Sequence, residues 1–255
     1  MTPHQALETA FQELAPYSDR HRWEFFNNLE HIKILTKHLH AGDRILDIGS
    51  GMGIVALALT KLGYQVDGLD KYVFLPDTYI SLSANAIENL RTIWAKNNLQ
   101  IINKDIQDFI PNTQYDCVIN IAVIEHQRDP KKFIQNCLAH LKPNGLFFCV
   151  TPNMVDVLNR LRVLAGRSAF RDLKSFFEAG EKFVGHWREY TLKEVVQMCE
   201  WSGLKTIAAH NSRTSPYFNK KDSWTRSLFT APFRFVGTLI PGGSDTNLVL
   251  ARKST

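Results

Sequence analysis

The chain lacks any long apolar run. No stretch of its 255 residues approaches the roughly 20 unbroken apolar residues that a membrane-spanning helix needs, and its first residues lack the apolar region of a secretory signal. Cysteine is also scarce, because the four cysteines form neither a Cys-x-x-Cys pair nor a disulfide-like spacing. We therefore expect a cytoplasmic protein whose cysteines, Cys117 and Cys149 among them, are core residues in a reducing compartment.

Internal repeats and low-complexity tracts are missing as well, which excludes a repeat protein or a disordered chain. A chain of 255 residues with 44% apolar residues can bury one good core and leaves little room for a second domain. The net charge of +5 is dispersed along the chain and not gathered into a basic block. The composition therefore predicts one domain, residues 1–255, that does not bind nucleic acid.

One missing glycine decides between two classes of ligand. Arg44 to Gly53 has the pattern of a strand that breaks into a glycine turn, and a helix of small and aliphatic residues follows as far as Leu62. This arrangement sets backbone N–H groups and a helix N-terminus against a polar ligand. A dinucleotide site would need its third glycine at position 54, where the chain has Ile54. The spacing therefore disfavours an NAD-dependent oxidoreductase, which stays the weaker alternative.

The motif Asp47-x-Gly49-x-Gly51-x-Gly53 resembles the first motif of class I S-adenosylmethionine-dependent methyltransferases. The resemblance implies a Rossmann-like, seven-stranded, mostly parallel α/β sheet with helices on both faces. It also implies a cofactor site in which the glycine loop wraps the methionine part, an acid after the second strand accepts the ribose hydroxyls, and two residues after the third strand contact the adenine. The residues expected to bind S-adenosylmethionine are Asp47, Gly49, Ser50, Gly51, Gly53, Asp70, Asp105 and Ile106.

Further segments follow in the order that this resemblance requires. We expect strands at 64–69, 100–103, 115–120 and 146–151, and a helix that begins at Pro130 after the N-cap Asp129 and runs to about Leu141. Val123-Ile124-Glu125-His126 is similar to the segment after strand four in small-molecule methyltransferases, including those of the ubiquinone pathway. The resemblance covers about 41–153, 185–209 and the closing strand 247–253.

Three segments look like additions to this core. Residues 1–40 form a helical cap, 154–185 a helical lid insertion beside the substrate end of the sheet, and 210–246 a basic, aromatic-rich loop within the C-terminal part, 186–255. The apolar run 226–241 is a candidate for peripheral contact with an anionic membrane or for holding a lipid-linked substrate. Packing against the sheet edge or a dimer interface is the alternative, and the oligomeric state is left open.

The catalytic candidates are His126, His186 and Tyr190. His126 is the first choice for a general base, because the segment after strand four faces the methyl group in this family and an imidazole can take a hydroxyl proton near neutral pH. A helix-start residue bonded to backbone is the equally weighted alternative for His126, and a structural role is open for His186. Neighbouring acids hold a metal in ubiquinone-pathway relatives, but Ala122 stands where a further carboxylate is needed, so we expect no metal.

The sequence therefore predicts an S-adenosylmethionine-dependent methyltransferase that acts on a small molecule. An oxygen of a sugar or of a lipid-linked intermediate is the expected acceptor. The segment Asn120-Ile121-Ala122-Val123 lacks the Pro-Pro-aromatic pattern of enzymes that methylate base amino groups. A non-catalytic protein that only binds S-adenosylmethionine remains the main alternative, because no motif proves turnover.

Overall fold

The computed structural model describes residues 1–17, 25–71, 73–74, 82–111, 113–170, 173–212, 237 and 239–254. Within these residues seven strands form one sheet in the order β3-β2-β1-β4-β5-β7-β6. The strands are β1 (Arg44–Ile48), β2 (Gln65–Leu69), β3 (Gln100–Ile102), β4 (Tyr115–Ile121), β5 (Leu141–Pro152), β6 (Leu204–Ser212) and β7 (Thr246–Lys253). Neighbouring strands from β3 to β5 are parallel, and β7 is antiparallel to both β5 and β6. The expected mostly parallel Rossmann-like sheet is confirmed.

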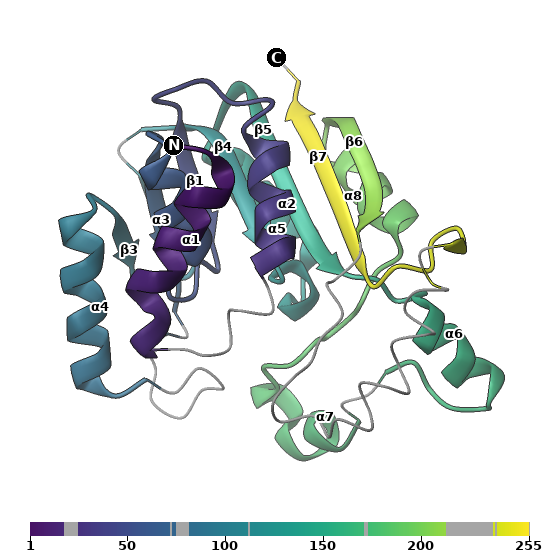
Figure 1. Cartoon of the computed structure of the whole chain (residues 1–255). Helices are drawn as coiled ribbons and strands as arrows, with labels where there is room; N and C mark the ends of the chain where they lie inside the picture. Colours follow the sequence, from purple (N-terminus) through teal and green to yellow (C-terminus); the bar gives the residue numbers. More distant parts are fainter. Residues whose placement is uncertain are drawn as a thin grey trace.

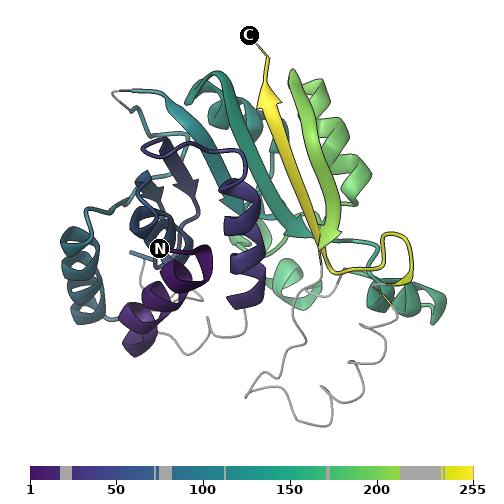
Figure 2. The same ribbon diagram turned by 45° about the horizontal axis from the view of Figure 1, so that its top comes forward.

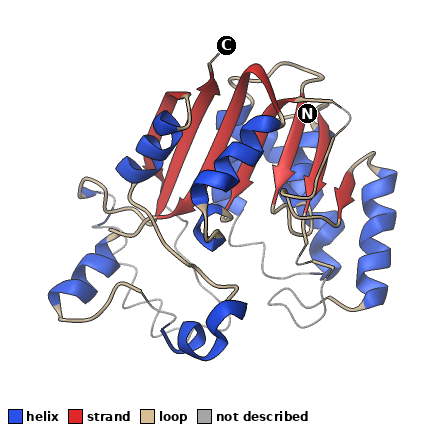
Figure 3. Cartoon of the chain, turned by 180° about the vertical axis from the view of Figure 1, so that it is seen from behind, coloured by secondary structure: helices blue, strands red, loops and turns tan. Residues whose placement is uncertain are grey.

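Alternating apolar residues of the strands build a core on each face of the sheet. In β1, Ile45 packs into one hydrophobic cluster and Leu46 into the other. The first cluster lies under α1 (Pro3–Leu14), α2 (Phe25–Leu35), α3 (Ile54–Lys61) and α4 (Ala84–Lys96), and the second lies under α5 (Pro130–Ala139) and α8 (Leu192–Trp201). Figures 1 and 3 show these two helical layers from opposite sides. Cys117 and Cys149 are fully buried in the sheet, as predicted.

Local capping fixes where several helices begin and end. The Asp129 carboxylate accepts a hydrogen bond from the backbone N–H of Lys132 and starts α5 behind Pro130. Gly63 follows α3 with φ +94°, a conformation that glycine adopts without strain. Helix α5 therefore begins, and helix α3 ends, where the sequence predicted these boundaries.

The lid insertion is helical and lies beyond the carboxyl ends of the parallel strands. It contains α6 (Val157–Leu164), α7 (Leu173–Ala179) and the short η4 (Gly180–Lys182). Figures 1 and 2 show α6 and α7 on the opposite side of the molecule from the C-terminus. The expected helix begins at Val157 and not at Met154, because the Asp156 carboxylate caps it by accepting from the backbone N–H of Asn159. The insertion thus stands where open α/β sheets bind their ligands.

Three predicted boundaries were wrong. Helix α5 ends at Ala139, and β5 begins at Leu141 and not at residue 146, with a register irregularity against β4. Strand β6 continues to Ser212 because its backbone pairs with β7 as far as Thr246, so the expected loop does not begin at 210. Most of the 226–241 run lies outside the described residues. No helix among those described is both long and apolar enough to cross a membrane.

Candidate active site

The glycine loop after β1 forms one wall of a cavity of about 840 Å³. Its three glycines have positive φ angles of +71° at Gly49, +55° at Gly51 and +84° at Gly53, which L side chains rarely adopt. Gly49 N–H and Ser50 N–H both donate to the Leu69 carbonyl, which ties the loop to the end of β2. Gly49, Ser50 and Gly51 line the cavity, whereas Gly53 sits at the start of α3 and packs close to Ile101. The loop is therefore a rigid, backbone-lined wall.

Two acids predicted to bind the cofactor lie at this wall. Asp47 lines the cavity and is only 3% exposed, and burial followed by repulsion from Asp70 raises its pKa to about 8. Asp70 is buried, and its carboxylate accepts from the backbone N–H groups of Gly51, at 2.9 Å, and Val73, at 3.0 Å. Asp70 thus already holds the glycine loop in place, a structural task that the sequence analysis did not assign to it.

The remaining predicted cofactor residues lie in a second cavity of about 590 Å³, which Lys71, Asp105 and Ile106 line together. Asp105 forms an ion pair with Lys71. Burial acts to raise the pKa of Asp105, but the hydrogen bond and charge of Lys71 hold that pKa below its ordinary value. An adenine amino group that approaches Asp105 would share its carboxylate with Lys71, a partner that the sequence pattern did not reveal.

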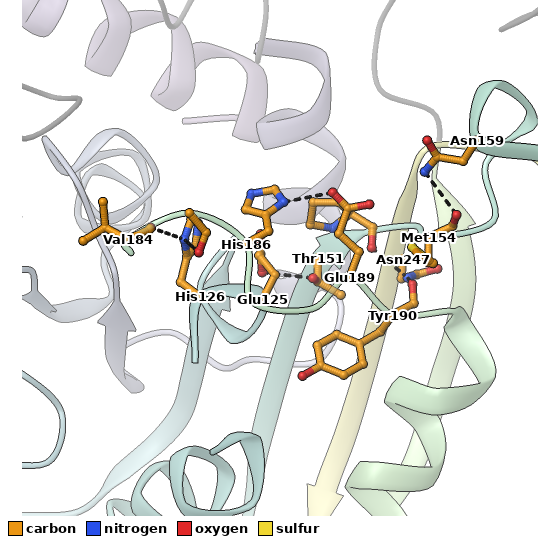
Figure 4. Close-up of polar contacts among 12 residues, drawn as sticks. Glu125, His126, Thr151, Met154, Asn159, Val184, His186, Glu189, Tyr190 and Asn247 are labelled. Carbon is orange, nitrogen blue, oxygen red and sulfur yellow. Dashed lines mark hydrogen bonds and ion pairs between the residues drawn. The ribbon is translucent and has the colours of Figure 1, made fainter. Parts of the chain in front are cut away.

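His126 lines both cavities and contacts the lid. It ends the short helix η3 (Ile124–His126), and its Nδ1 lies 2.9 Å from the carbonyl oxygen of Val184 and 3.1 Å from that of Gly185. Carbonyls only accept, so Nδ1 carries the hydrogen and Nε2 is the nitrogen that can accept a proton. Burial and then the neighbouring His186 lower the pKa of His126, which keeps the imidazole neutral near pH 7. Figure 4 shows this backbone contact.

The other two catalytic candidates differ in position. His186 lines the first cavity, its ring meets the His126 ring edge to face at 4.8 Å between centroids, and its Nδ1 lies 2.9 Å from Glu189 Oε1. Tyr190 is 2% exposed, belongs to the hydrophobic cluster under α8 and lines neither cavity. In Figure 4 its ring points away from the imidazoles. The structure thus brings His126 and His186 together and leaves Tyr190 apart.

A buried carboxyl beside these histidines was not among the predicted catalytic residues. Glu125 is 0% exposed, and its Oε2 accepts a hydrogen bond of 2.9 Å from Thr151 Oγ1. Burial raises the pKa of Glu125 to about 7. The Glu125-His126 sequence pair was the available signal, but only the fold shows that the glutamate is enclosed.

Helix α2 also contributes residues that the sequence analysis did not select. Asn28 and His31 are buried and line the first cavity. Tyr17, at the end of η1 (Ala15–Tyr17), lines it too. The apolar periodicity of this region predicted a packed helix but gave no sign that its polar residues face the cavity.

Glu125, His126 and His186 each offer one ligand atom to a possible metal ion, and these atoms lie within 4.8 Å of one another. Ala122, which stands where a further carboxylate is needed, adds no ligand atom to this group.

Comparison with known proteins identifies the family. A family model described as "Methyltransferase domain" matches residues 5–209. Ubiquinone biosynthesis O-methyltransferase of Rickettsia akari is 35% identical over 43% of this chain and 40% of its own length. The protein of the same description from Actinobacillus pleuropneumoniae is 28% identical over 64% of this chain and 66% of its own. The chain therefore spans less than two thirds of the length of these relatives.

Solved structures agree on the fold. A Burkholderia thailandensis 1,6-didemethyltoxoflavin-N1-methyltransferase, crystallised with S-adenosylhomocysteine, superposes with a TM-score of 0.57 at 14% identity and covers all of this chain and 92% of its own. The cyclopropane synthase MmaA2 of Mycobacterium tuberculosis gives a TM-score of 0.58 at 18% identity over 88% of this chain and 84% of its own. With the glycine loop, the sheet order and the family match together, the chain belongs to the class I S-adenosylmethionine-dependent methyltransferases.

Proposed function

We propose that this protein transfers a methyl group from S-adenosylmethionine to a hydroxyl oxygen of a small molecule. The observation that carries the proposal is one cavity that joins the glycine loop, Asp47 and His126. A site for a cationic cofactor and a neutral imidazole therefore face the same space. The ubiquinone-pathway relatives, which are described as O-methyltransferases, support oxygen as the acceptor atom.

The residues present fit the proposed cofactor. The loop from Gly49 to Gly51 lines the cavity beside the place of the methionine part, and the buried Asp47 carboxylate offers a counter-charge to its ammonium group. Ser50 Oγ is buried and has no hydrogen-bond partner among the described residues, so a bound ligand can satisfy it. Asp70 serves the ribose, and Asp105 with Ile106 serves the adenine from the second cavity.

The protein's chemical task in this proposal is alignment, exclusion of water and removal of one proton. The sulfonium supplies an activated methyl group, so no residue has to activate the carbon. The acceptor hydroxyl is held in line with that methyl group in a cavity closed by the lid residues Phe183 and Val184. Nε2 of His126 takes the hydroxyl proton, since Nδ1 is already engaged by the lid carbonyls.

The acceptor in this proposal is a sugar or a lipid-linked intermediate. Polar side chains of Asn28, Thr151 and Asp245 line the cavity and can bond hydroxyl groups. The lid also exposes apolar side chains, with Leu164 83%, Leu173 64% and Phe177 84% exposed, among the cations Arg162, Arg167 and Lys174. A surface with both properties fits an anionic lipid layer or a lipid-linked substrate, and we extend the proposal of peripheral membrane contact from the segment 226–241 to the lid.

Calorimetric titration with S-adenosylhomocysteine, with NAD as the comparison, tests the proposal. We expect micromolar binding of S-adenosylhomocysteine alone. Asp70→Ala should weaken it by about 2–4 kcal/mol, because the variant loses charge-assisted hydrogen bonds to the ribose and the anchor of Gly51. A preference for NAD, or unchanged affinity in the variant, would contradict the assignment of this cavity.

A further inference from the structure

Lys71 and Asp105 set a hydrogen-bond donor beside an acceptor in the second cavity. Lys71 is the residue directly after Asp70 at the end of β2, and Asp105 follows β3. The two strand ends are tied together, because the backbone N–H of Asp70 donates to the Ile102 carbonyl at 3.0 Å. Lys71 Nζ lies 2.5 Å from Asp105 Oδ2, and both residues line the cavity. A ligand in this cavity therefore meets an ammonium and a carboxylate side by side.

The backbone of the loop after β3 is turned to the carboxylate of Asp105. Asp105 Oδ1 accepts from the backbone N–H of Gln107 at 3.1 Å, and the backbone of Ile106 bonds the same carboxylate. These N–H groups are therefore engaged within the loop. An ammonium carries three N–H donors, so Lys71 can bond Asp105 and a ligand atom at the same time. Among the described residues, Lys71 is therefore the donor that stands next to this carboxylate.

The edge of an adenine ring carries complementary groups in the same arrangement. Its exocyclic amino group donates hydrogen bonds, and the neighbouring ring nitrogen N1 accepts one. A 6-oxopurine reverses both groups, because its O6 accepts and its N1–H donates. A carboxylate that accepts from the amino group and an adjacent ammonium that donates to N1 therefore match adenine and mismatch a 6-oxopurine held in the same orientation.

We propose that Lys71 is a specificity-determining residue that donates to N1 of the adenine while Asp105 accepts from the amino group. The inference rests on the proposed function, in which Asp105 and Ile106 serve the adenine of S-adenosylmethionine. Two consecutive residues at the end of β2, Asp70 and Lys71, then serve the ribose and the base. Because the ammonium is charged, its bond to N1 is stronger than one from a neutral donor.

Calorimetric titration with S-adenosylhomocysteine and with its 1-deaza analogue, in which a C–H group replaces N1, tests this assignment through binding alone. The wild-type protein should bind S-adenosylhomocysteine about tenfold or more tightly than the analogue, because the analogue leaves the Lys71 donor without its partner. In Lys71→Met the affinity for S-adenosylhomocysteine should fall about tenfold, while the affinity for the analogue should stay within about twofold. The preference between the two ligands is then lost.

Lys132→Met is the matched control, because Lys132 is an exposed lysine that lines the same cavity and lies outside the Lys71–Asp105 pair. This variant should keep the full preference for S-adenosylhomocysteine. A loss of preference equal to that of Lys71→Met would overturn the inference, since any cation of the cavity would then have the same effect. The unfolding temperature reports whether each variant is folded.

Three further results would contradict the role given to Lys71. Equal weakening of both ligands in Lys71→Met would mean that the lysine only holds Asp105 in place. Tighter binding of S-adenosylhomocysteine in that variant would mean that Lys71 competes with the adenine for the carboxylate. Equal affinity of the wild-type protein for the two ligands would mean that N1 has no partner, and this comparison decides even if the variant does not fold.

Failure of the proposed function shows differently. It would appear as binding of S-adenosylhomocysteine with the full preference over the 1-deaza analogue, but without methyl transfer to any hydroxyl acceptor. Absent binding of both ligands to the wild-type protein would overturn the proposed function and the role of Lys71 together.

Discussion

At the scale of single residues, Asp47 is a buried carboxyl group that we expect to bind a positively charged ligand. Its carboxyl is protonated in much of the free protein at pH 7, since burial and Asp70 raise its pKa to about 8. A bound ammonium group favours the carboxylate and lowers that pKa, so cofactor binding should release a proton near pH 7. Binding should therefore strengthen as pH rises toward 8.

Calorimetry in buffers of different ionisation enthalpy measures this proton release. We expect a sizeable fraction of one proton per S-adenosylhomocysteine bound at pH 7 and close to none at pH 9. Asp47→Asn should remove the release and weaken binding by about 1–3 kcal/mol, the cost of a lost charged hydrogen bond. Proton uptake, or release that persists in the variant, would contradict the role given to Asp47.

Substitution of two glycines in the loop, Gly49 and Gly51, distinguishes the cost of a left-handed backbone from the cost of a steric clash. A Cβ at Gly49 would lie 2.4 Å from Val123 Cγ2, whereas a Cβ at Gly51 meets nothing within 4 Å, and both residues have positive φ. Gly51→Ala should therefore cost about 1 kcal/mol of stability for the left-handed backbone alone. Gly49→Ala should cost about 1–3 kcal/mol more of stability than Gly51→Ala, because its Cβ would also clash with Val123.

Urea unfolding of the two alanine variants measures the difference. Equal destabilisation would mean that Val123 moves aside without cost. The glycine motif predicts one feature of these two positions and not the other. The glycine pattern indicated a tight turn at both positions, but the contact with Val123 depends on the segment after β4.

At the scale of elements, helix α8 begins with a complete capping box. Thr191 Oγ1 accepts from Glu194 N–H, and Glu194 Oε2 accepts from Thr191 N–H. Thr191→Ala should destabilise the protein by about 0.5–2 kcal/mol, because it leaves the Glu194 N–H without its cap. Thr92→Ala is the matched control, an exposed threonine inside α4 whose replacement by a better helix former should be neutral or slightly stabilising.

Chemical denaturation of the two variants at neutral pH measures both effects. A loss in Thr92→Ala as large as that in Thr191→Ala would show that the capping box contributes nothing specific. A box of this kind can be predicted from sequence because Thr191 and Glu194 bond each other within one helical turn, although Glu194 also pairs with Arg188.

The contact between η3 and the lid was not predictable in that way. His126 and Val184 are 58 positions apart in the sequence. Arg128 adds a cation–π contact, 4.3 Å from the Trp187 ring centroid, to the same connection. No local pattern in either segment indicates the other, since the contact exists only after the sheet has assembled beneath them.

At the scale of the whole molecule, the exposed apolar and basic side chains of the lid determine the proposed contact with lipid. We expect the protein to sediment with vesicles rich in phosphatidylglycerol at low ionic strength and to be released by salt. Phe177→Glu should reduce the partition coefficient tenfold or more, because it removes a large exposed apolar side chain and adds repulsion.

Ile110→Glu is the control for the vesicle experiment, because Ile110 is 88% exposed and lies outside the lid. It should leave sedimentation unchanged. Protein that stays in the supernatant, or equal losses in both variants, would remove the membrane contact from the proposal and leave the lid as a cover for small substrates.

The amino-acid sequence by itself determined the features that depend on neighbouring residues. These are the strand, glycine turn and helix around Gly49 and the cap at Asp129. They were predictable because backbone conformation and capping act over a few positions. The resemblance to the family then ordered these elements into the sheet that the structure shows.

Only the tertiary structure decided which distant side chains meet. Lys71 pairs with Asp105, His186 reaches Glu125 and His126, and Tyr190 turns into the core, although the sequence offered it as a catalytic candidate. Such contacts follow from how helices and loops pack on the finished sheet, where burial and charge are set by all neighbours together. The enclosure of Glu125 therefore belongs to the fold, because no local sequence pattern encodes it.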